Sequence, residues 1–280
     1  MVERRELGGN QQKVGAIVLF LFLTHFAIGI IFSLALVSRE AGVKFFRFNA
    51  GLAAILIAVA FAFRTGGAET STVARLAFGS LVVTEAAVVL YWATVGRTLA
   101  SIRPVIVGVA CVGGILTLVL QAIEVTSGWS ATATALTVAS FLTSAALLGT
   151  TCTAMILGHW YLVIPSMKVS YLQSIVKLHI VSLVLRVAVV AAAIVVAVMT
   201  WQPGLGPSFR HYVQSLDGIF FWMRVLFGLA GPAVLAWLTW ETAKIQSTQS
   251  ATGILYVDLF TVVVGELLAK AVLLATRVPV

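Results

Sequence analysis

Residues 175–200 read IVKLHIVSLVLRVAVVAAAIVVAVMT. Lys177 lies at the start of this stretch, and His179 and Arg186 are its only other ionisable side chains. A helix that crosses a membrane needs about 20 consecutive, mainly apolar residues, so the stretch is long enough to cross. It therefore predicts a transmembrane helix that carries a histidine and an arginine into the membrane.

Other stretches of the chain are also long and apolar enough to span a membrane. The connections are short, so consecutive helices should pack antiparallel, and backbone polar groups in lipid must be satisfied within helices. We predict an all-α, polytopic integral membrane helical bundle of about eight transmembrane helices, a single domain over residues 1–280 with no soluble domain. The polar stretch Trp201–Asp217 holds two prolines and two glycines and predicts a loop. The predicted spans are residues 14–38, 48–64, 74–96, 104–124, 131–159, 175–200, 218–241 and 251–276.

The composition agrees with a membrane protein. Hydrophobic residues make up 60% of the 280 residues and charged residues only 10%, too few to cover the surface of a water-soluble domain. The formal net charge of +8 suits anionic lipid headgroups, and no dense basic stretch indicates nucleic acid. We expect membrane lipids and other subunits of a membrane complex as partners, and a multi-pass location in the cell inner (cytoplasmic) membrane. Cys111 and Cys152 lie in apolar runs without metal-ligand spacing and should be small buried hydrophobes.

Ionisable side chains inside the predicted spans are the candidate functional residues, because each is costly in a bilayer unless it is paired or hydrated. The sequence contains no phosphate-binding GxxxxGK[ST] loop, no HExxH zinc motif and no GxSxG nucleophile elbow. The classes that depend on these motifs are therefore not indicated. The candidates are His25, Glu85, His159, His179, Arg186, Arg224, Asp258, Glu266 and Lys270.

The histidines are the candidates for cofactor binding. His159 ends one predicted span and His179 begins the next, so chain connectivity places both in the same half of the membrane. Two facing imidazoles can hold the iron of haem b, and Arg186, two turns beyond His179 on the same helix face, could contact a haem propionate or a quinone oxygen. His159 also fits an interfacial aromatic belt with its neighbours, and His25 fits a packing position or a quinone contact.

The last predicted span carries most of the acidic groups. Glu266 and Lys270 are four residues apart, which favours an ion pair within the helix. Asp258 has no partner in its own span, and Arg186 or Arg224 are its expected partners. With Glu85, these carboxylates could form either a proton path or a set of structural ion pairs. Pro232, four residues after Gly228, predicts a kink in the preceding span.

Three functional hypotheses follow from these residues. The first is an integral membrane subunit of a bacterial respiratory or electron-transfer complex that binds quinone, haem b or both, and anchors partner redox subunits. The all-helical architecture resembles that of the integral anchors of bacterial respiratory oxidoreductases, a resemblance of architecture alone. The second is a proton-coupled small-solute transporter that uses the intramembrane carboxylates. The third is a structural or assembly subunit in which every buried charge is a paired one.

Overall fold

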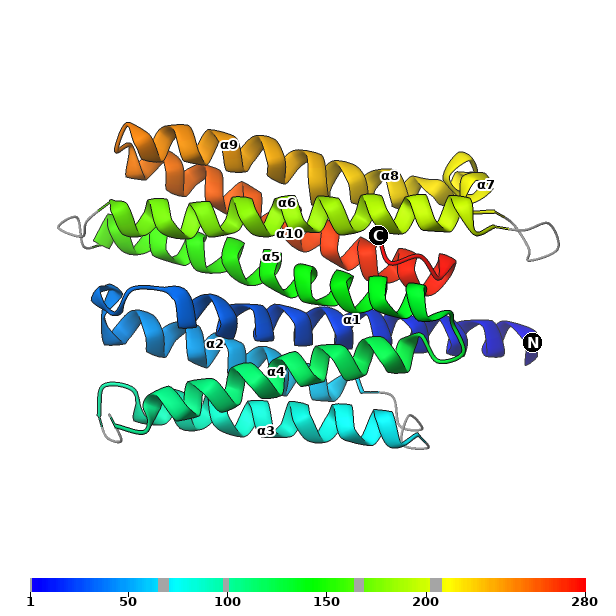
Figure 1. Cartoon of the computed structure of the whole chain (residues 1–280), viewed down its shortest axis with the longest axis horizontal. Coiled ribbons are helices and arrows are strands. Elements are labelled where there is room, and N and C mark those ends of the chain that lie inside the picture. The colour runs from blue at the N-terminus through cyan, green and yellow to red at the C-terminus, as the bar shows by residue number, and fades with distance from the viewer. Residues whose placement is uncertain (1, 65–70, 98–100, 164–168, 202–207) are drawn as a thin grey trace.

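The computed structural model describes residues 2–64, 71–97, 101–163, 169–201 and 208–280. These residues form long helices without a strand, and eight of the helical segments are long and apolar enough to cross a membrane (Figure 1). The prediction of an all-α polytopic bundle is thereby confirmed. Six spans are single helices, namely α1 (Val2–Leu36), α2 (Gly42–Ala62), α3 (Thr72–Thr94), α4 (Arg103–Val125), α5 (Ala131–Val163) and α6 (Ser170–Met199).

The seventh span is interrupted and the eighth is continuous. The seventh consists of α8 (Ile219–Val225), the π-helical turn η4 (Leu226–Ala230) and α9 (Gly231–Lys244), and the eighth is α10 (Thr248–Thr276). Near Pro232, where the sequence predicts a kink, the span contains a π-helical segment that ends at Ala230, two residues before this proline, which lies in the first turn of α9. Proline is tolerated there because the first N–H groups of a helix have no partner within it.

Several predicted boundaries need correction. α1 begins at Val2 rather than at residue 14, and α6 begins at Ser170 rather than at residue 175. The second span was expected to begin at residue 48, but α2 begins at Gly42 because Lys44 and Arg47 extend the helix beyond its apolar part. The stretch predicted as a loop, Trp201–Asp217, lies partly outside the described residues (202–207), and its described part includes the short helix α7 (Phe209–Gln214). The Ser208 side chain caps α7 by accepting a hydrogen bond from the His211 backbone N–H. Short 3-10 turns also precede α2 and α8, at Arg39–Ala41 (η1) and Leu216–Gly218 (η3).

The bundle has two regions that meet along α1 and α5 (Figure 1). Helices α1 to α4 form one region, and α5, α6 and the last two spans form the other. Gly29 of α1 packs against Gly149 of α5 so closely that a Cβ on either glycine would collide with the opposite backbone. Next to this contact the Ser33 hydroxyl lies 2.6 Å from that of Thr153. Small residues therefore let the two central helices approach, as is usual in membrane bundles.

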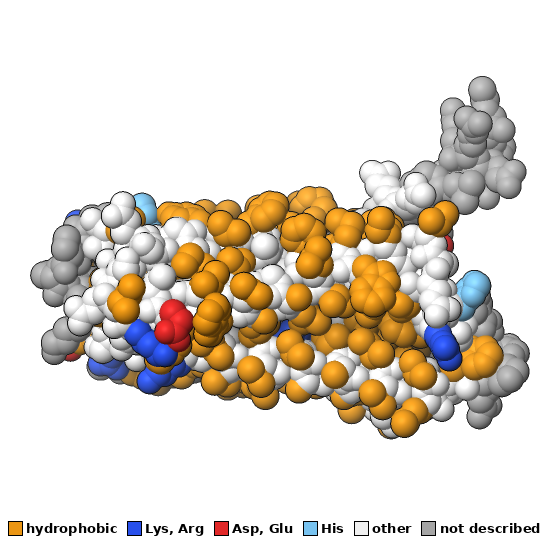
Figure 2. Space-filling model, turned by 90° about the horizontal axis from the view of Figure 1, so that it is seen from above, with side chains coloured by type: hydrophobic (Ala, Val, Ile, Leu, Met, Phe, Trp, Pro, Cys, Tyr) orange, Lys and Arg blue, Asp and Glu red, His pale blue; other side chains and the backbone are white. Residues whose placement is uncertain are grey.

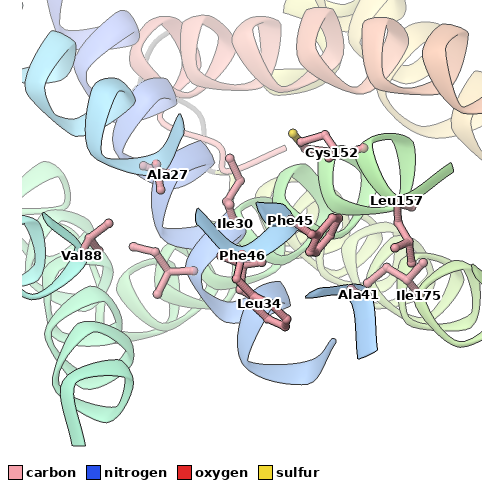
Figure 3. Close-up of a cluster of buried hydrophobic side chains, with 14 of the residues drawn as sticks. Ala27, Ile30, Leu34, Ala41, Phe45, Phe46, Val88, Cys152, Leu157 and Ile175 are labelled. Carbon is pink, nitrogen blue, oxygen red and sulfur yellow. The ribbon is translucent and has the colours of Figure 1, made fainter. Parts of the chain in front are cut away.

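The apolar side chains divide between an interior cluster and the outer surface. Phe45, Ile30 and Leu157 belong to a buried cluster that joins α1, α2, α5 and α6 (Figure 3). On the outside, a broad belt of apolar side chains covers the middle of the molecule, and charged groups gather at its ends (Figure 2). Val112 of α4 is 66% exposed and Val184 of α6 is 61% exposed. An apolar belt of this kind, on the face that Figure 2 shows, suits contact with lipid rather than water.

Candidate functional site

A cluster of buried charges surrounds Glu266 of α10. Its Oε1 atom accepts hydrogen bonds from Arg186 Nε of α6 and Arg224 Nη2 of α8, both at 2.9 Å. Its Oε2 atom accepts from Arg186 Nη2 at 3.1 Å, from the Ser144 hydroxyl at 2.5 Å and from Lys270 Nζ at 3.5 Å. All five side chains are buried. One carboxylate thus joins four helices in the membrane interior, and we call these five residues together with Ser140 the Glu266 cluster.

Arg186 and Lys270 have further partners in the cluster. Arg186 Nη1 donates to the Ser140 hydroxyl at 2.6 Å, and its Nη2 donates to the backbone oxygen of Val280 at 3.2 Å. Lys270 Nζ donates to the Ser144 hydroxyl at 2.6 Å. Among side chains, the cluster therefore combines three cationic groups with one carboxylate. Because a buried charge costs several kcal/mol without compensation, the two arginines and the lysine depend on Glu266 and the surrounding oxygen atoms for their stability.

A second buried group contains His179 of α6, Asp258 of α10 and Thr151 of α5, and we call it the His179 triad. His179 Nε2 lies 2.8 Å from Asp258 Oδ2. On the other side of the ring, His179 Nδ1 lies 2.9 Å from the Thr151 hydroxyl. The side chains of His179 and Asp258 are fully buried.

The contacts of the His179 triad suit a proton shared between His179 and Asp258. The Thr151 hydroxyl donates its only proton to the Leu147 backbone oxygen at 2.7 Å, so it accepts from His179 Nδ1–H. With Nδ1 protonated, a bare Nε2 facing a bare carboxylate would bring two lone pairs together. The 2.8 Å contact between His179 Nε2 and Asp258 Oδ2 has the distance of an ion pair without the angle of a hydrogen bond. A proton held between the two groups, in an imidazolium with a carboxylate or a neutral imidazole with a carboxylic acid, would remove the repulsion of the lone pairs.

The triad and the cluster stack along the same three helices. Seven residues separate Thr151 from Ser144 and His179 from Arg186, and eight separate Asp258 from Glu266. At 1.5 Å per residue, the two groups are about 10–12 Å apart along the helices. Asp258 and Glu266 each lie about 15 Å from an end of α10, so both groups lie within the hydrocarbon layer.

Arg224 lies one residue before the end of α8, directly ahead of the π-helical turn. Its guanidinium lies over Gly228, where a Cβ would collide with Nη1, and Gly228 in turn packs against Gly265 of α10. Within the described part of the chain, Arg224 Nε and Nη1 have no hydrogen-bond partner. A buried arginine beside a π-helical turn is a candidate functional feature, because π turns are frequent at functional sites.

The pairing expected for span eight is partly right. The ion pair between Glu266 and Lys270 is confirmed, although Ser144 lies closer to the lysine than the carboxylate does. The expected partners of Asp258 are wrong, because Arg186 and Arg224 both bind Glu266 instead. His179 takes their place beside Asp258. The physical reason is the rotation of α10 about its own axis. This rotation points Asp258 toward His179 and away from the two arginines.

The other candidate residues lie outside these two groups. His159 is exposed near the end of α5 and its Nδ1 lies 3.1 Å from the Tyr256 hydroxyl, an aromatic contact at the membrane surface. His25 of α1 is buried with its ring against Phe141, and its two nitrogens have no hydrogen-bond partner among the described residues. Glu85 is half-buried on α3, which packs against α2 and α4 rather than beside the cluster.

The haem and quinone predictions for His159, His179, Arg186 and His25 remain predictions. Both ring nitrogens of His179 already have protein partners, so an iron ligand there would first have to give up Thr151 or Asp258. Among the described residues, no three His, Cys, Asp or Glu side chains are grouped so as to hold a metal ion.

Sequence reasoning missed Ser140, Ser144 and Thr151. All three lie on α5, at intervals of four and seven residues that place them on one helix face. That spacing is a signal in principle, but α5 contains many other serines and threonines that bond only to their own helix. The hydroxyls that contact the buried charged groups can be identified only when the side chains on the neighbouring helices are known.

Comparison with known proteins gives no assignment. No protein-family model matches the chain, and no curated protein or solved structure matches it. The functional proposal therefore depends on the geometry of the buried groups.

Proposed function

We propose that this protein is a proton-coupled carrier of a small solute in the cytoplasmic membrane of a bacterial cell. The observation that carries the proposal is the His179 triad, in which a histidine nitrogen and a carboxylate oxygen lie 2.8 Å apart in the membrane interior, close enough to share a proton. Ionisable groups at this depth are expensive and mark ion or proton pathways in membrane proteins.

The Glu266 cluster supports the proposal through its charge. Loss of the shared proton would leave a negative charge on the His179 triad, about 10–12 Å from a cluster whose side chains carry three cationic groups and one carboxylate. In a low-dielectric interior, charges at this distance still attract each other appreciably. The surplus of positive charge therefore stabilises the deprotonated triad, and the two groups are electrostatically coupled.

The interrupted seventh span supplies a segment that can move. Arg224 links α8 to Glu266, and the π-helical turn η4 directly follows it. Transporters commonly place such broken helices beside the site where the solute and coupling ion bind. In this proposal, a change in the charge of the triad alters the electrostatic force on Arg224, and the seventh span (α8, η4 and α9) moves as a result.

The test is proton movement in proteoliposomes with an internal pH dye and a panel of small solutes. We expect Asp258→Asn and His179→Gln to reduce protein-dependent proton movement to background, because neither variant retains the shared proton. Asp217→Asn, an exposed acidic residue outside the network, is the matched control and should behave as wild type. Equal proton movement in wild type and Asp258→Asn would refute the proposal. Loss of folding in Asp258→Asn, with no proton movement in wild type, would favour the structural-subunit hypothesis.

The electron-transfer subunit remains a second candidate. His179 and Arg186 are both buried on one face of α6, as the quinone and haem b hypothesis requires. A reduced-minus-oxidised spectrum of the purified protein decides this candidate. A haem band that is lost in His159→Ala or His179→Ala, or co-purification with redox subunits, would favour it over the carrier.

A further inference from the structure

The first four helices enclose a cavity of about 440 Å³, far from the Glu266 cluster. It lies where α1 ends and α4 begins, at one membrane face. Its inner wall is apolar and includes Leu34, Phe46, Val88 and Ala110, one from each helix. A cavity of this size falls within the usual range for small-molecule sites.

Two arginines line the outer part of the same cavity. Arg39 belongs to the turn η1 between α1 and α2 and is exposed, and Arg103 is the first residue of α4. Arg103 Nη2 donates to the Thr94 backbone oxygen at 3.3 Å, which fixes the side chain at the cavity mouth. Tyr91 lines the same region. The cavity is thus apolar toward the membrane interior and cationic toward its surface.

The surroundings of the mouth strengthen its positive charge. Lys44 and Arg97 are exposed at the same membrane face, and Arg47 is partly buried there, with its Nη2 donating to the Val95 backbone oxygen. The acidic residue nearest in sequence to Arg39 is Glu40, whose carboxylate accepts a hydrogen bond from the Tyr171 hydroxyl. Basic pockets between transmembrane helices are typical binding sites for acidic lipid headgroups.

A second cavity, of about 290 Å³, occupies the opposite end of the same four helices and provides an internal comparison. Its polar lining combines Arg64 with Glu124 and Gln121, and the Arg64 guanidinium lies over the Phe78 ring. A carboxylate in the wall repels an acidic headgroup. The difference in charge between two cavities of similar apolar character therefore indicates selectivity at the first one.

We propose that the larger cavity binds an acidic phospholipid, with the phosphate against Arg39 and Arg103 and one acyl chain among the apolar residues. A neutral quinone ring would gain little from two arginines, whereas a phosphate accepts charge-assisted hydrogen bonds from both. This site is independent of proton coupling at the His179 triad.

The experiment is thermal unfolding of the full-length, delipidated protein in a neutral detergent, titrated with phosphatidylglycerol. The same titration is run with phosphatidylcholine of matched chains, with inorganic phosphate and with a quinone. We expect phosphatidylglycerol to raise the Tm at lower concentrations than phosphatidylcholine does. Arg39→Gln and Arg103→Gln should each weaken this effect about fivefold, as expected for one basic residue near an acidic headgroup.

Two further variants complete the test. Arg64→Gln removes the same charge at the opposite cavity and should leave phosphatidylglycerol binding unchanged. Ala50→Phe fills the wall of the larger cavity without altering its charge and should weaken binding of the lipid. If Ala50→Phe does not fold, the two arginine variants still decide the result. Equal stabilisation by both lipids, stabilisation by the quinone alone, or full reproduction of the effect by inorganic phosphate would each overturn the proposal.

Discussion

The two regions of the bundle contain different kinds of buried polar side chain. In α1–α4 the buried polar side chains are largely hydroxyls and amides, as in the 2.9 Å contact between the Ser80 and Thr117 hydroxyls. In the region of α5 to α10, the interior contains the Glu266 cluster and the His179 triad. Hydroxyls satisfied by their own helix cost little, whereas buried charges are retained only where geometry compensates them. The difference places the buried ion pairs in the second region, and the proposed proton coupling with them.

The largest expected effect comes from removing the central carboxylate. Glu266→Gln leaves Arg186, Arg224 and Lys270 without a counter-charge, and breaking a buried pair typically costs about 3–5 kcal/mol. We expect the Tm of the purified protein to fall by about 10 °C or more, or the protein not to fold.

The control for this variant is an exposed acidic residue in a similar pair. Glu241 lies 2.8 Å from Lys244 with both side chains about half exposed. Glu241→Gln should change stability by less than about 1 kcal/mol, since exposed pairs contribute little. If the two variants were equally stable, the buried charges would not distinguish the two regions.

A smaller effect is expected where the two regions join. Gly149→Val places side-chain atoms in the backbone of Gly29, and overpacking of this kind costs about 1–3 kcal/mol. Thermal unfolding should show a loss of several degrees. Gly79→Ala is the matched control, because a Cβ at Gly79 meets no atom within 4 Å. A wild-type Tm for Gly149→Val would show that the regions meet less tightly than described.

The smallest effect is expected at Glu85, the acidic residue within the α3 span. Glu85→Gln should alter stability by no more than about 0.5 kcal/mol, because the side chain is only half-buried and belongs to neither charged group. Proton movement in proteoliposomes should also be unchanged. Loss of proton movement in this variant would extend the chemistry into the first region and end the division proposed here.

Much of the fold could be predicted from the sequence, because lipid imposes long apolar helices and penalises any other backbone arrangement. The candidate residues could also be identified, since ionisable groups such as Arg186 and Glu266 stand out in apolar spans. The residues with which these groups pair could not be predicted from the sequence. Whether Asp258 faces a histidine or an arginine depends on the rotation of α6 and α10 about their axes, and a rotation of one residue is invisible in the spacing along a single helix.

The π-helical turn beside Arg224 has a consequence for the register of its span. A π turn accommodates one more residue than a regular α-helical turn, so it offsets every side chain before it relative to those after it. Deletion of one residue between Leu226 and Ala230 would restore a regular helix and turn α8 by about 100° relative to α9. Arg224 would then leave Glu266 and point in another direction. A single inserted residue is therefore sufficient to account for how this arginine reaches the centre of the bundle.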